Sequence, residues 1–152
     1  MTLHVRAQLR RAVAVQLAGL PTTAERVYLG RMRALGADHL PTLLVYTDDE
    51  ETGLTAMGSP ALQERRVMLM VEARAKGTDS GDLQDLLDAI AAEVEPAILN
   101  GPTFGGLATL AELTKTRTRI EDRAERLDGG LRLEFRVHYQ TAEGRPTEAI
   151  ID

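Results

Sequence analysis

The stretch QERRVMLMVEARAK at residues 63–76 alternates so regularly that it decides the fold of the chain. Successive residues of a β-strand point to opposite faces, so its side chains divide into two sets. The set expected to face the core comprises Arg65, Val67, Leu69, Val71 and Ala73. The opposite set mixes charge with methionine and comprises Glu64, Arg66, Met68, Met70, Glu72 and Arg74. We predict a long strand with one buried face and one face that is apolar in the middle and wet at its ends.

The residues before this strand predict one helix and two further strands. Apolar residues three and four positions apart predict an amphipathic helix over residues 2–18, which Gly19 ends. A short strand is expected over residues 26–33, and residues 35–38 are expected to form a loop. The run at residues 42–47 is continuously β-prone, which is typical of a strand covered on both sides.

The residues after this strand predict a second helix and a hairpin. The apolar stripe at residues 83–98, opposed by acidic side chains, is typical of a helix on a core. Residues 107–123 alternate threonine with basic residues, which indicates a long and partly exposed strand. The triplet at 128–130, Asp-Gly-Gly, is a hairpin signal before a cleanly alternating strand at 131–139. Residues 141–152 are polar and are expected to form a mobile tail.

The order of predicted elements is therefore α-β-β-β-α-β-β. Two helices packed on a mostly antiparallel sheet of about five strands make a two-layer α+β domain. A chain of 152 residues supplies one such core rather than two. We expect a single domain over residues 1–140, followed by the polar C-terminal tail at 141–152.

Composition excludes several classes of function. The chain has a net charge of −5, three Tyr, two Phe and no Trp, which argues against coating a polyanion or stacking bases. It has no Cys, so thiol nucleophiles, disulfides and cysteine metal sites are excluded. The first residues lead directly into the amphipathic pattern, so no leader is expected. No run approaches the roughly 18–20 apolar residues of a membrane span, so no membrane partner is expected.

No motif of enzymatic chemistry is found. The histidines at positions 4, 39 and 138 fall on separate predicted elements and without metal-binding spacing. Phosphate-binding, nucleophile-elbow and dinucleotide motifs are absent from the sequence. The glycines at 101, 105 and 106 follow a helix and precede a strand, the reverse of a phosphate cradle. We predict no catalytic residue, no cofactor and no metal, although the many carboxylates leave an acid-based enzyme as a remote alternative.

Two groups of residues are candidate contact sites. The first is an acidic block in the predicted connection at 48–60, made of Asp48, Asp49, Glu50 and Glu51. It lacks the spacing of a calcium loop. Three interpretations stay open for it: a solvated loop, a charged contact or DNA-repelling lumen surface, and, least favoured, a metal site.

The second candidate is a subunit or tube interface on the charged face of the alternating strand, made of Arg66, Met68, Met70, Glu72 and Arg74. Mixed-sign strand faces are usually solvated ladders worth about 0–1 kcal/mol for each pair. Across a subunit boundary, the same ladders set register and partner choice. The two methionines between the charges favour the interface.

The pattern of elements resembles the tail terminator proteins of long-tailed phages, also called tail-tube terminator or minor tail proteins. The stretches that carry the resemblance are the helix start Leu9–Val13, the strand Leu40–Tyr46, the acidic stretch Asp48–Gly53, the strand Gln63–Ala75, the helix Leu83–Ile98 with its late Pro96, and the terminal Val137-His138-Tyr139. The resemblance spans roughly residues 3–140. The threonine-rich stretch at 107–118 and the polar tail depart from it.

The resemblance implies a structural virion protein and no enzyme. Such a subunit is expected to form a homohexameric ring on the head-proximal end of the tail tube. It would end tube polymerisation and offer a head-joining surface. The implied partners are the tail tube protein and a head–tail connector protein, and DNA passes through the ring without specific binding. The implied location is the tail or neck of the virion, assembled in the host cytoplasm. An acidic chain suits a DNA channel, because tight phosphate binding would retard ejection.

Two other functions stay open at this level. Another ring protein of the phage neck, such as a head–tail connector or tail completion protein, has the same class of surface. A small bacterial α+β binding domain is the less favoured alternative. Mass measurements of the native oligomer and the length of tails made without the gene discriminate among these functions.

Overall fold

The alternating stretch forms β3 (Leu62–Gly77), the central strand of a five-stranded sheet. This arrangement comes from a computed structural model, which describes residues 2–31 and 39–150. The other elements are α1 (Val5–Leu17), β1 (Val27–Leu29), β2 (Thr42–Ala56), α2 (Ser80–Leu99), β4 (Leu110–Arg123) and β5 (Arg126–Ala142). The predicted α+β class and the order α-β-β-β-α-β-β are confirmed.

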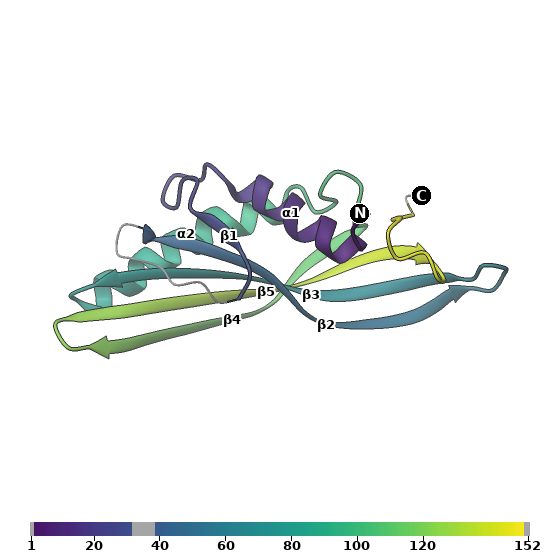
Figure 1. Ribbon diagram of the computed structural model, residues 1–152. Helices are drawn as coiled ribbons and strands as arrows, with labels where there is room; N and C mark the ends of the chain where they lie inside the picture. The colour runs from purple at the N-terminus through teal and green to yellow at the C-terminus, as the bar shows by residue number, and fades with distance from the viewer. Residues whose placement is uncertain (1, 32–38, 151–152) are drawn as a thin grey trace.

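The sheet has the strand order β1-β2-β3-β5-β4. Among the described strands, the short β1 runs parallel to β2, and the pairs β2–β3, β3–β5 and β5–β4 are antiparallel. Figure 1 shows a long, twisted sheet with α1 and α2 on the same side. The opposite side, which we call the open face, carries no helix of the described residues. The domain therefore has two layers, and the open face is the sheet surface on which a contact site can lie.

The core lies between the helices and the inner residues of β3 and β5. Val67, Leu69 and Val71 are at most 1% exposed, which confirms the predicted core face of β3. Phe135 and Tyr139, also buried, supply the bulk that the few aromatic residues can give. Burial of apolar side chains on this side of the sheet explains why both helices pack there.

Both hairpins differ from the sequence prediction. The connection predicted at 48–60 is largely strand, because β2 continues to Ala56 and pairs with β3, as Glu51 does with Arg66. The triplet at 128–130 lies inside β5, and the chain instead turns at Ala124, whose φ is +59°. Polar strand residues that pair across the sheet have the composition of a loop, so composition alone misplaced both turns.

The first strand and the C-terminal segment add two details. Within the predicted strand at 26–33, Val27–Leu29 form β1, and Arg26, Gly30 and Arg31 lie outside it. Residues 32–38, which include the predicted loop at 35–38, lie outside the described residues. The polar segment after β5, for which we expect a mobile tail, contacts the start of α1. The carbonyl oxygen of Pro146 accepts a hydrogen bond of 2.8 Å from the Val5 amide.

Candidate functional site

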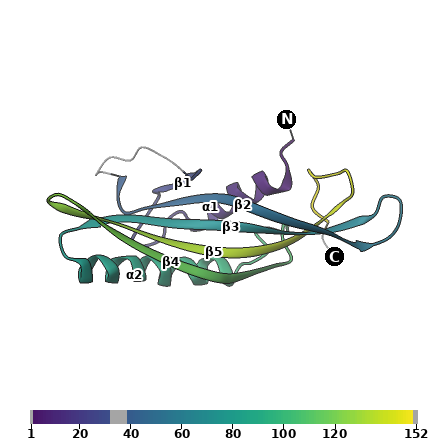
Figure 2. The same ribbon diagram turned by 90° about the horizontal axis from the view of Figure 1, so that it is seen from below.

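The interface residues predicted on β3 all lie on the open face. They alternate with the core face, and Figure 2 shows the strands from the side that bears them, in front of the helices. Met70 is 5% exposed and Met68 is half-buried, while Arg66, Glu72 and Arg74 surround them with charge. The predicted apolar middle between polar ends is therefore the observed pattern of this face.

Tyr46 of β2 extends this apolar middle to the neighbouring strand. It pairs with Met70 in the sheet, and its hydroxyl donates a hydrogen bond of 3.2 Å to Glu72 Oε1. Burial, and then the negative charge of Glu72, raise the pKa of Tyr46 above its ordinary value. The Arg31 guanidinium lies 5.8 Å from the centre of the Tyr46 ring, within range of a cation–π contact.

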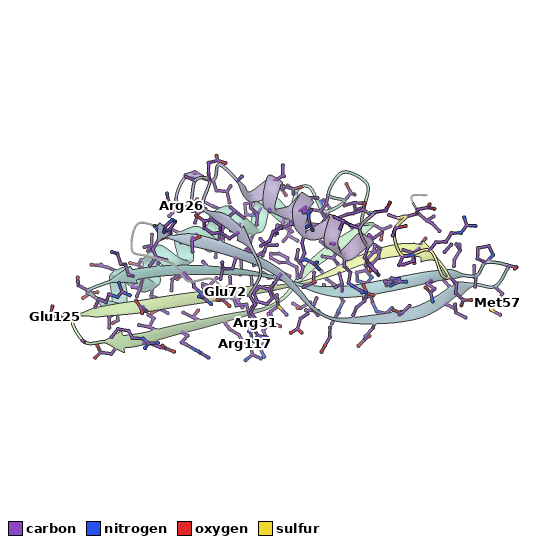
Figure 3. All side chains as sticks on the ribbon, viewed as in Figure 1. Arg26, Arg31, Met57, Glu72, Arg117 and Glu125 are labelled. Carbon is purple, nitrogen blue, oxygen red and sulfur yellow. The ribbon has the colours of Figure 1, made fainter. Side chains whose placement is uncertain are left out.

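One end of the open face is hollowed, with a volume of about 850 Å³. We call this cavity the arginine hollow, after the seven arginines that line it: Arg31, Arg74, Arg117, Arg119, Arg123, Arg126 and Arg132. Glu72, Glu121 and Asp128 are the carboxylates of the lining. Figure 3 shows Arg31, Glu72 and Arg117 gathered beneath the sheet. Sequence reasoning noticed several of these arginines but did not bring them to one place.

The other end of the open face carries a histidine between two carboxylates. His138 Nδ1 lies 3.3 Å from Glu64 Oε1, and His138 Nε2 lies 3.2 Å from Glu112 Oε1. The contact with His138 is the largest cause of the lowered pKa of Glu112. Among the described residues, no three His, Asp or Glu side chains converge in a way that could hold a metal ion.

The acidic block is not one surface. Asp48, Asp49 and Glu51 are exposed, whereas the Glu50 side chain is only 8% exposed. The Glu50 carboxylate accepts a hydrogen bond from Tyr139 and pairs with Arg6 Nη1 at 2.5 Å and Arg65 Nη1 at 3.2 Å. Glu50 therefore joins α1 to the sheet, whereas a solvated loop residue would make no such contacts.

A register shift explains why the sequence did not separate Glu50 from its neighbours. The pairing of β2 with β3 is irregular between Thr47 and Glu50, as in a β-bulge. A bulge inserts a residue and re-aims the side chains after it. Four consecutive acids carry no mark of such a shift, so their separate environments become visible only in three dimensions.

His4 caps the start of α1 and couples it to pH. Its Nδ1 accepts a hydrogen bond of 3.0 Å from the Arg6 amide, which requires that nitrogen to be unprotonated. Burial first, and then the charges of Arg6 and Arg65, lower the pKa of His4 below 6.5. The neutral imidazole is the form that the fold favours.

We therefore expect the free energy of unfolding to fall as the pH drops below about 6.5, the ordinary histidine pKa, because the unfolded chain then binds a proton that the fold resists. In His4→Asn, the cap has an acceptor that does not titrate. Urea unfolding at pH 7.5 and at pH 5.5 measures the effect as the difference between the two proteins. Parallel losses of stability in both would contradict this role of His4.

Comparisons with known proteins give little more. No protein-family model matches the chain, and no curated protein matches it. Among solved structures, a chain of the "Virion of native gene transfer agent (GTA) particle" is similar with a TM-score of 0.44 and 15% identity. The match covers 89% of this chain and 92% of that one. In the part that the structure describes, no helix combines the length and the apolar character needed to cross a membrane.

Proposed function

We propose that the chain is a structural subunit of a phage-like virion, and more narrowly a ring subunit that caps the head-proximal end of a tail tube. In this role it ends tube polymerisation and offers a joining surface to the head. The resemblance of its sequence pattern to tail terminators motivates the proposal, and the observed order of elements is compatible with it.

The observation that carries an assembly function is the open face of the sheet. Half-buried Met68 lies in its middle beside Met70 and Tyr46, which are only 5% and 6% exposed, and charged side chains surround all three. Apolar residues enclosed by a polar rim are typical of protein–protein contact surfaces, and methionine adapts to the shape of a partner. Arg66, Met68, Met70, Glu72 and Arg74 remain our candidates for the subunit or tube interface.

The proposed ring has protein partners and a channel for DNA. We expect a homohexamer that contacts a tail tube protein and a head–tail connector protein, in the tail or neck of a virion assembled in the host cytoplasm. DNA passes through without specific binding, which suits a net charge of −5. Asp48, Asp49 and Glu51 are candidates for the lumen or for a contact, because they are exposed.

Deletion of the gene in a particle-producing host tests this function. We expect tails of uncontrolled length in electron micrographs, because nothing would stop tube polymerisation, and normal length once the gene is supplied in trans. A Met68→Asp variant should fail to restore length, whereas Thr116→Asp, at an exposed position of β4, should restore it. Tails of normal length without the gene would overturn the terminator role. Normal tails that do not join heads would instead indicate a connector.

A further inference from the structure

The arginine hollow has more positive than negative charge. Its carboxylates are shared: Glu121 pairs with Arg119 at 3.4 Å and with Arg123 at 2.9 Å. Asp128 is similarly shared between Arg123 and Arg126, and Glu134, behind the lining, is shared between Arg117 and Arg132. With Glu72 included, seven arginines meet four carboxylates. A surplus of this kind suits an anionic partner, because guanidinium groups bind carboxylates through paired donors.

The matching negative charge lies on α2. The helix contains five acidic residues and no Lys or Arg. Three of them, Asp82, Asp85 and Asp88, are exposed, and none of the three forms an ion pair with any described residue. We call these three side chains the acidic face of α2. Unpaired like charges along one helix repel each other, so a cationic partner would relieve them.

The two charged surfaces lie back to back at the same end of the sheet. Gly129 and Gly130 line the arginine hollow on the open face. On the other side of the sheet, a Cβ atom at Gly129 would come within 3.0 Å of Leu83 and Leu87, which belong to the first half of α2. Figure 2 shows α2 running beside this end of β4 and β5. The end of the domain is thus basic in front and acidic behind.

We infer that the arginine hollow of one copy receives the acidic face of α2 of a second copy. The inference deepens the proposed ring function and rests on it. The contact joins unlike surfaces, and repeated contacts of that kind close into a ring or extend as a filament. Complementary charge across it sets register and suppresses other pairings. It also gives the arginines of β4, which share their carboxylates within the chain, a further acidic partner.

A second copy suits the hollow better than nucleic acid does. Its arginines are already partly neutralised by Glu72, Glu121 and Asp128, so the remaining surplus is small and matches a few carboxylates better than a continuous phosphate backbone. The lining contains no aromatic side chain among the described residues on which a base could stack. The chain as a whole is acidic, with a net charge of −5, so its field opposes the approach of DNA, whereas between two copies the local basic hollow and the acidic face of α2 are complementary.

Two charge-reversed proteins test the contact. The hollow variant carries Arg117→Glu and Arg119→Glu, whose side chains are 55% and 80% exposed, and the helix variant carries Asp85→Arg and Asp88→Arg. Each alone should self-associate about tenfold more weakly or not at all in sedimentation velocity, because like charges then meet. Mixed in equal amounts, they should assemble again, because each reversed surface meets an opposite one.

A matched control separates this effect from a change in net charge. Arg11→Glu with Arg145→Glu reverses two exposed arginines outside the hollow and should assemble as the wild type does. Wild-type assembly that persists in both reversed variants overturns the front-to-back contact and leaves the ring function intact. A wild-type chain that stays monomeric across the micromolar range overturns both. Fluorescence anisotropy with a labelled DNA duplex tests nucleic acid as the alternative partner. DNA binding by the wild type and the helix variant that is lost in the hollow variant would assign the hollow to nucleic acid.

Discussion

Glu50→Ala is expected to lower the free energy of unfolding by about 3–5 kcal/mol, the usual cost of removing one partner of a buried ion pair. The loss leaves Arg65, whose side chain is 12% exposed, without its carboxylate partner. It also deprives the buried Tyr139 hydroxyl of the acceptor it reaches in the fold. For a domain of this size, that free energy corresponds to a melting temperature lower by about 6–20 °C. Urea unfolding monitored by circular dichroism measures it.

Glu51→Ala is the matched control, because it removes the same side chain one residue further along β2. The Glu51 side chain is 80% exposed and its one ion pair, with Arg66, spans 3.4 Å. Such surface pairs contribute about 0–1 kcal/mol, so the control should stay close to the wild type. Equal losses in the two variants would contradict the structural role of Glu50 and return it to the acidic surface with its neighbours.

The predictions that succeeded rest on periodicity. The two-residue alternation of β3 and the apolar stripe of α2 each specify one buried face, and both faces are buried as expected. A strand or helix that buries one face must place its apolar residues at the corresponding spacing, so the sequence records the choice directly. Once β3, α2 and the terminal strand β5 are assigned, the order of the remaining elements follows.

The predictions that failed concern residues whose environment is set by a partner strand. The second half of β2 has the composition of a loop, because most of its side chains are exposed and its stability comes from pairing with β3. Glu50 becomes buried through an irregular register and through contacts with α1 and β5, which are far away in sequence. Local patterns carry no information on such contacts.

The candidate site could be predicted in part for the same reason. The charged face of β3, including Met68 and Met70, was predicted because alternation places those residues together. The arginine hollow could not be predicted, because Arg31, Arg74 and Arg132 come from segments that only the sheet topology brings to one end. Over the whole chain the 23 acidic residues outnumber the 18 basic ones, so the net charge gives no hint of a local surplus of arginine.

A substitution at Gly129 is the second change that we expect to lower stability strongly. In the sequence it is part of a hairpin signal, but in the structure it lies inside β5, away from the turn. A Cβ at this position would lie 3.0 Å from Leu83 Cγ, Leu83 Cδ2 and Leu87 Cδ1. Those leucines are at most 1% exposed and lie in the packed core, so a new Cβ would force them to shift by a few tenths of an ångström against their neighbours. The glycine is required because α2 approaches the strand backbone so closely.

Gly129→Ala should therefore destabilise the domain by about 1–3 kcal/mol through overpacking beneath α2. Gly130→Ala makes the identical chemical change one residue later, on the open face, where the nearest heavy atom to the new Cβ is the Ala73 carbonyl oxygen at 3.9 Å. There the smaller conformational freedom of the unfolded chain should stabilise the fold by up to about 1 kcal/mol. Neither position has a left-handed φ. Urea unfolding measures both changes in stability. A loss in Gly129→Ala with a gain in Gly130→Ala would identify the close approach of α2, rather than a turn, as the reason for the glycine. Equal effects at both positions would refute that explanation.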